Sequence, residues 1–174
     1  TSVTDANGCI QSLNDSKTLT VNEIPVVDVS GTTEICKGDV TNISFDFSAG
    51  LAPWILFYDI NGTVATPFSL SNISDSISVS PTTTSVYTYT AILDANLCGS
   101  NFTDAVTITV NQLPEVDVSG GGEICDDGST VDVIFNTSSG TPTFNFEYTV
   151  GINNKIVSNV GYQHVIATNE AGTY

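Results

Sequence analysis

The sequence contains no arginine and no methionine, and of its 174 residues only three are lysines, one is a histidine and one is a tryptophan. Against these few cations stand 19 acidic residues, so the formal net charge is −16. Such a surface repels phosphate backbones and anionic membranes, so we expect no nucleic-acid partner. No apolar run reaches the roughly 18 residues that a membrane span needs, so we expect no direct membrane insertion.

Groups that catalysis would need are equally scarce. A Ser-His-Asp or Cys-His site would need His164, the single histidine, beside a nucleophile. His164 lies in a strand-like stretch, and the acidic residues fall in turns and on polar faces. We therefore predict that the chain is not an enzyme, that it needs no cofactor, and that His164 is structural or faces the solvent. Because 40% of residues are hydrophobic, the acidity does not indicate disorder.

The sequence does contain an internal repeat. The stretch Val21–Cys36 (VNEIPVVDVSGTTEIC) returns 89 positions later as Val110–Cys125 (VNQLPEVDVSGGGEIC), and Asp5–Cys9 (DANGC) returns at the same offset as Asp94–Cys98 (DANLC). A fixed period of this length indicates an array of small domains. We expect the tail of one repeat in residues 1–21, a complete repeat in 22–110 and the first part of another in 111–174. Because residue 1 is not methionine, we expect a window from a longer array.

Hydrophobic residues alternate with period two almost throughout, which predicts an all-β fold. Turn signals divide the complete repeat into seven strands, the pattern of an immunoglobulin-like β-sandwich. The strands are expected at 25–29, 40–47, 54–58, 63–70, 77–79, 86–93 and 105–110. The predicted core consists of Phe45, Phe47, Trp54, Tyr87, Tyr89, Val106 and Ile108.

Three finer predictions follow from the same patterns. Residues 54–58 are uniformly apolar, so we expect a strand covered on both faces. Tyr87, Tyr89 and Ala91 should share one face. The first repeat should contribute a last strand at 18–21. Between repeats, residues 110–114 lack Gly and Ser and end in a proline, which predicts a stiff joint and a rod of end-to-end sandwiches.

The order of these motifs resembles a known family. The resemblance rests on the order of six motifs: Ile35-Cys36-Lys37-Gly38, Gly50 to Trp54, Asn61-Gly62, Ser80-Pro81, Tyr87 to Tyr89 and Asp94 to Cys98. With these motifs the sequence resembles the Ig-like/PKD-like repeats of large Bacteroidetes surface proteins, most closely the SprB-type gliding-motility adhesins. The resemblance implies type IX secretion, an extracellular filament on the bacterial surface, and the secretion and gliding machinery as partners. The following repeat departs from it, with Thr143 in place of Trp54, so we interpret the tryptophan as packing.

Two cysteines per repeat, without a CxxC pair or histidine cluster, favour disulfides over zinc. Within one repeat the candidate bridge is Cys36–Cys98, favoured because an excised repeat would be self-contained. An immunoglobulin-type topology, however, puts them at opposite poles, on the order of 25 Å apart, whereas a bridge needs Cα atoms within about 7 Å. A staple to the neighbouring repeat is the alternative. Partners of Cys9 and Cys125 are expected outside these residues.

Two kinds of site are weaker candidates. Asp94 and Asn96, with their copies Asp5 and Asn7, could supply oxygen ligands to calcium, although Asp and Asn are also ordinary turn formers. By the family resemblance, Asp75-Ser76-Ile77 matches a Bacteroidetes O-glycosylation motif, which makes Ser76 a candidate acceptor.

The sequence therefore predicts a structural stalk segment of a secreted cell-surface adhesin that serves attachment and gliding, with neighbouring repeats as its partners. One alternative is that the repeats bind a glycan or protein ligand at their loop tips. The other is that they space a secreted hydrolase from its substrate.

Overall fold

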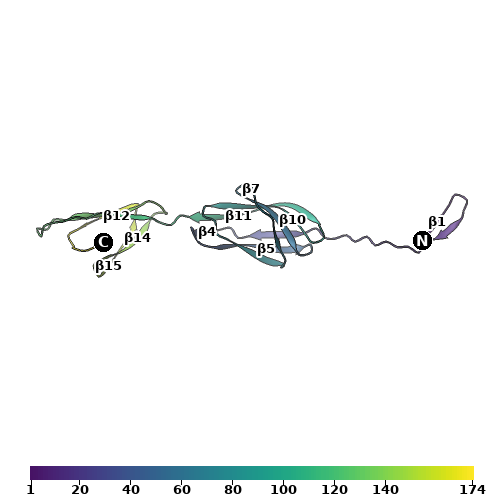
Figure 1. The fold of residues 1–174 in the computed structure, drawn as a ribbon, viewed down its shortest axis with the longest axis horizontal. Coiled ribbons are helices and arrows are strands. Elements are labelled where there is room, and N and C mark those ends of the chain that lie inside the picture. Colours follow the sequence, from purple (N-terminus) through teal and green to yellow (C-terminus); the bar gives the residue numbers. More distant parts are fainter.

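A computed structural model describes all 174 residues and contains strands but no helices. Figure 1 shows three groups of strands along one long axis: an N-terminal hairpin, a central sandwich and a C-terminal group. The hairpin is β1 (Ser2–Thr4) and β2 (Ile10–Ser12). The strands of the central sandwich are β3 (Val26–Ser30), β4 (Thr33–Cys36), β5 (Thr41–Ala49), β6 (Trp54–Ile60), β7 (Thr63–Val64), β8 (Phe68–Leu70), β9 (Ser74–Val79), β10 (Ser85–Leu93) and β11 (Gly99–Asn111).

The central sandwich has two sheets. One has the order β3-β5-β9, and the other has the order β4-β11-β10-β6-β7, with β8 also paired to β6. The chain changes sheets between β3 and β4, where Gly31 has φ +132° and a Cβ there would lie 2.7 Å from the Asn42 carbonyl oxygen. Only glycine fits this crossing. β4 then pairs with β11 in parallel, and it is the main strand that the sequence patterns did not predict.

The predicted core is confirmed: all seven named residues are buried. Ile43, Phe45 and Phe47 alternate along β5 and meet Tyr87 and Tyr89 from the facing sheet. Every member of the core cluster lies between Val29 and Val110, so the sandwich closes on its own side chains. The Asn61-Gly62 hairpin is also confirmed, with positive φ at both residues.

Three local predictions are wrong. β6 is covered on one face only, because Phe57 is 39% exposed. The inward face of β10 passes from Tyr89 to Ile92 rather than to Ala91, because a register shift between Tyr89 and Ala91 inserts one residue. The expected strand at 63–70 is two short strands, since Pro67 has no N–H to continue the ladder.

The C-terminal group repeats part of this arrangement. Its strands are β12 (Val116–Gly120), β13 (Val131–Thr137), β14 (Phe144–Val150), β15 (Asn153–Val160) and β16 (Gln163–Thr168). The order β12-β13-β16 matches β3-β5-β9, and β14 pairs with β15. Val118 pairs with Phe135 as Val29 pairs with Phe45, so the offset is 89 in the first strand and 90 in the second.

One inserted residue therefore shifts everything after β12, which corrects one reading of the sequence. Phe144, not Thr143, occupies the place of Trp54. A Cβ on Gly140 would contact Pro114 and Phe144, as one on Gly50 would contact Pro25 and Trp54. Phe144 is buried and packs on Phe146 and Tyr162. In both places a glycine thus lies against the joint proline and an aromatic ring, but Pro25 is buried whereas Pro114 is exposed.

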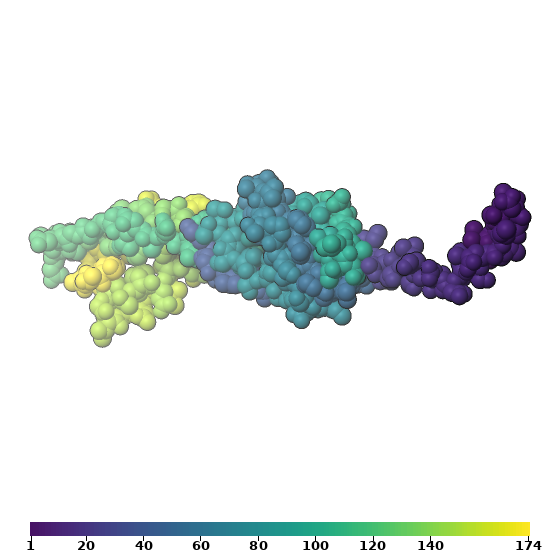
Figure 2. All heavy atoms as spheres, turned by 45° about the vertical axis from the view of Figure 1, so that its right-hand side comes forward, coloured from purple at the N-terminus to yellow at the C-terminus, as the bar shows by residue number.

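The predicted strand at 18–21 is wrong. Residues 13–24 run between the hairpin and the sandwich without strand pairing, as the separate N-terminal part in Figure 2 illustrates. Leu19 and Val21 are 88% and 86% exposed, whereas Ile108 and Val110, which lie 89 positions further on, are buried in β11. Strand formation at these positions requires the neighbours that β4 and β10 provide to β11.

Candidate functional site

The residues that the sequence singled out gather at the two ends of the central sandwich. We call the end that carries Pro25, Gly50 and the loop Asp94–Cys98 the N-terminal pole. We call the end where Cys36 pairs with Asn111 the C-terminal pole. At the C-terminal pole β11 ends at Asn111, and the chain passes through Gln112 and Leu113 to Pro114 and the C-terminal group. Both poles are therefore boundaries between groups of strands.

The loop Asp94–Cys98 is organised by one carboxylate. Asp94 Oδ1 accepts hydrogen bonds from the backbone N–H groups of Asn96 (2.9 Å) and Cys98 (2.8 Å). Asp94 Oδ2 accepts another from the N–H of Leu51 (3.0 Å), and the N–H of Ala95 donates to the Leu51 carbonyl (2.9 Å). Asp94 is only 2% exposed. The side chain therefore fixes its own loop and ties it to the segment that covers Pro25.

The environment of Asp94 shifts its pKa in two directions. Desolvation raises the pKa of this carboxyl, but the three backbone N–H donors lower it, and the net pKa lies below the usual aspartate value. The ionised form is thus the one that the loop stabilises. The Leu51 contact had no signal in the sequence, because it joins segments more than 40 residues apart.

The N-terminal hairpin contains the same loop. Asp5 Oδ1 accepts from the N–H groups of Asn7 (2.9 Å) and Cys9 (2.9 Å), and these bonds lower the pKa of Asp5. The four calcium candidates therefore form two separate Asx-type loops rather than one site. In each loop, N–H groups point their positive ends at the carboxylate, where a cation would have to bind. No group of three or more His, Cys, Asp or Glu side chains suited to a metal ion occurs in the structure.

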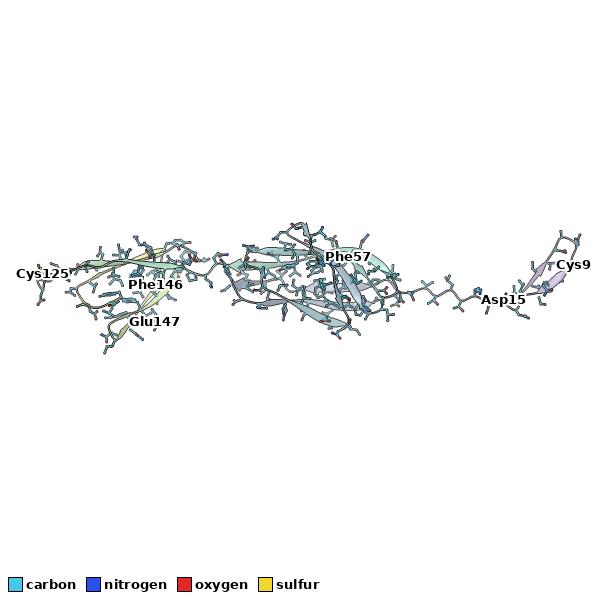
Figure 3. The ribbon with its side chains drawn as sticks, viewed as in Figure 1. Cys9, Asp15, Phe57, Cys125, Phe146 and Glu147 are labelled. Atoms are coloured by element: carbon cyan, nitrogen blue, oxygen red, sulfur yellow. The ribbon has the colours of Figure 1, made fainter.

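The cysteines lie apart, and all four are free thiols in this structure. Cys36 is opposite Asn111 at the end of β11, and Cys98 directly precedes Gly99 at its beginning. Twelve strand steps of about 3.3 Å separate these ends, or about 40 Å. The structure therefore does not bring Cys36 and Cys98 together, and the favoured bridge within one repeat is sterically impossible in this fold. Figure 3 places Cys9 and Cys125 at the two far ends of the molecule.

Two other candidates lie on strands. Ser76 is exposed on β9, which is an edge strand of its sheet. Its hydroxyl is accessible, while Asp75 accepts a hydrogen bond from the Ser76 N–H (2.9 Å). His164 pairs with Phe135 across β16 and β13 and is half-buried. Its position corresponds to Asp75 in the central sandwich, since Asp75 pairs with Phe45.

Surface hollows are shallow or lie at open sheet edges. The largest, of about 420 Å³, is lined by Val131, Val133, Ile124 and Tyr174 in the C-terminal group. Residues 122–124, the counterparts of Thr33–Ile35 in β4, line this hollow, and no strand of the C-terminal group takes the place of β11 there, so the hollow is an open core edge. Two smaller ones, of about 350 Å³ and 270 Å³, flank Phe57 on the outer face of β6. Phe57 was expected to be covered, so sequence patterns missed this exposed ring.

The fold thus defines an all-β protein with a sandwich-like core whose distinctive residues lie at its poles. No helix of the structure meets the length and hydropathy of a membrane span. No protein-family model matches the sequence. The chain is similar to Nucleoporin POM152 of Saccharomyces cerevisiae, with 27% identity over 164 residues. The match covers 84% of this chain but 12% of the length of that protein.

Proposed function

We propose that the chain is a structural segment of a tandem array of immunoglobulin-like β-sandwiches. In this proposal the central sandwich is one complete unit, the C-terminal group begins the next, and the N-terminal hairpin ends the previous one. The array forms the stalk of a large secreted cell-surface adhesin that serves attachment and gliding. It does no chemistry itself, and its direct partners are neighbouring units, with secretion and gliding machinery as partners of the whole filament.

The observation that carries the proposal is the joint at each pole. Pro25 is fully buried against Gly50 and Trp54, so the entering chain is held by the unit that it enters. At the other pole, Ser139 Oγ donates to the Leu113 carbonyl (2.6 Å) and the Ser138 N–H donates to the Glu115 carbonyl (2.9 Å). Only Gln112 and Leu113 remain between the end of β11 and Pro114. So short a joint restricts bending and keeps successive units end to end, as in Figure 1.

The cell-surface setting rests on the order of the motifs, and the similarity to a nucleoporin favours a second setting. In that alternative the same extended array serves as an architectural segment of a nuclear-pore protein. Both settings use the units as spacers. An antibody against residues 22–110 separates them: the adhesin proposal expects labelling of intact cells, and labelling only after permeabilisation would overturn it.

The array itself is tested by small-angle scattering of the 174-residue chain. We expect an elongated particle whose cross-section is that of one sandwich. The matched control inserts a Gly-Ser linker of ten residues between Gln112 and Leu113, which should broaden the distribution of long distances. A compact particle, or identical curves for the two proteins, would contradict the proposal.

A further inference from the structure

We propose that consecutive units are joined covalently, by a disulfide from Cys36 of one unit to the Cys98 counterpart of the unit that follows it. This inference rests on the proposed array and adds a modification to its joints. It explains why each complete unit carries two cysteines that cannot reach each other.

The first step concerns the exit side of a joint. Cys36 lies at the last paired position of β4, opposite Asn111, and the Lys37 N–H donates to the Asn111 carbonyl (2.9 Å). The Cys36 N–H donates to Asp39 Oδ2 (3.2 Å), so the turn that carries the thiol is held in place. Cys36 is exposed. Its thiol is therefore accessible at the C-terminal pole, opposite the residue where β11 ends and the joint begins.

The second step concerns the entry side. Cys98 belongs to the loop that Asp94 fixes against Leu51, and neighbouring Gly50 lies against Pro25. The Cys98 loop is thus on the pole that receives the preceding unit. The C-terminal group begins in a similar way, since a Cβ on Gly140 would lie 3.1 Å from the Pro114 Cα, although Pro114 is exposed. In the proposed array, each joint then has a Cys36-type thiol on its exit side and a Cys98-type loop on its entry side.

The third step is the direction of the chain. Cys36 lies opposite the last residue of β11 and Cys98 directly precedes its first residue, so successive units in an end-to-end array bring unlike ends together. Cys125 at the far end of the C-terminal group and Cys9 at the far end of the hairpin fit this alternation, as Figure 3 shows. Each joint would then hold one bridge, and the cysteines of the 174-residue chain would find their partners in neighbouring units.

The chemistry needs an oxidant, which we assign to a low-molecular-weight disulfide such as oxidised glutathione. The Cys36 thiolate attacks one sulfur and releases a glutathione thiolate, which leaves a mixed disulfide. The Cys98 thiolate of the next unit then attacks the Cys36 sulfur and releases the second glutathione. Two protein thiols are oxidised, one disulfide is reduced to two thiols, and the two thiol protons pass to the buffer or to the released thiolates.

The test uses two copies of residues 22–110 in one chain, since the central sandwich has a closed core of its own. Joining Val110 of the first copy to Asn22 of the second reproduces the Val21–Asn22 bond of the natural sequence. Three double Cys→Ser variants isolate the pairs. The inner variant keeps Cys36 of the first copy and Cys98 of the second, the outer variant keeps the other two, and the third keeps Cys36 and Cys98 of a single copy.

After oxidation with glutathione, intact-mass analysis with and without alkylation counts the bridged molecules. We expect nearly complete bridging in monomers of the inner variant and free thiols in the other two. Free thiols in a folded inner variant, or bridging within a single copy, would overturn the disulfide. Scattering of the same protein keeps the two proposals distinct. An elongated particle with free inner thiols refutes only the disulfide, whereas a compact particle refutes the array.

Discussion

Replacement of Trp54 tests the packing of the central sandwich at the point where it covers the joint. The indole is 4% exposed and is stacked on Phe47, with ring centroids 4.1 Å apart and planes at 3°. Truncation of a buried Trp to Ala costs about 3–5 kcal/mol of unfolding free energy. The buried Trp54 Nε1 has no hydrogen-bond partner, and burial of such an unpaired group costs about 1–3 kcal/mol of stability. Removal of the indole recovers part of this cost and so reduces the expected loss. We therefore expect Trp54→Ala to destabilise by about 3 kcal/mol, at the lower end of the range.

Two controls make this magnitude specific. Trp54→Phe keeps a ring on Phe47, as Phe144 does at the corresponding place, and removes the unpaired N–H, so it should cost about 1 kcal/mol or less. Phe57→Ala, on the same strand but on the outer face, should also cost about 1 kcal/mol, because its ring is partly exposed. Urea denaturation of residues 22–110 measures the stability of all three variants. The transition is followed by circular dichroism rather than tryptophan fluorescence, because Trp54 is the only tryptophan and two of the variants lack it. A loss below about 1 kcal/mol for Trp54→Ala, or equal losses for Trp54→Ala and Phe57→Ala, would refute the packing argument.

Two further predictions concern the N-terminal pole. Gly50→Ala should destabilise the sandwich by about 3 kcal/mol, because φ is +86° and the new Cβ would lie 2.8 Å from Pro25 Cβ. The control Gly62→Ala, at φ +79° but in open space, should cost only about 1 kcal/mol in the same urea denaturation assay. The folded-state pKa of Asp94 lies below its unfolded value, so the stability that this carboxylate contributes is present above about pH 4 and is lost as the pH falls through the folded pKa. Asp94→Asn should therefore lower the urea midpoint at pH 7 and flatten its dependence on pH below about 4; an unchanged profile would contradict the assigned role.

The sequence predicted well those features that depend on alternation along one strand. The inward residues of β5 and the aromatic pair of β10 follow from period two, and the structure buries them as expected. The errors occur where a second segment decides the outcome. β4 exists because β11 pairs with it, and Leu19 and Val21 stay exposed because residues 13–24 have no such neighbour. Periodicity contains no information about a partner strand.

The candidate site was predicted in composition but not in arrangement. The Asp94 loop and its copy were found from the repeat, yet the bond that ties the Asp94 carboxylate to the Leu51 N–H is a long-range contact, which the repeat did not indicate. The inserted residue after β12 was also hidden, because the sequence match between the copies ends at Cys125 and the shift begins just beyond it. Register across strands was needed to place Phe144 opposite Trp54.

The position of the repeated segments favours a role in which the boundaries of the units matter most. Val110–Cys125 runs from the end of the central sandwich through the joint to exposed Cys125, and Val21–Cys36 runs from the unpaired segment to exposed Cys36 at the C-terminal pole. The Asp94–Cys98 loop lies at the N-terminal pole, and its copy Asp5–Cys9 joins the two strands of the hairpin. By contrast, the exposed Phe57 on the outer face of β6 does not recur. At the offset of 90 residues, its place in β14 is taken by Glu147. A ligand site shared by all units would require the opposite pattern, with recurring side chains on an exposed face and variable joints.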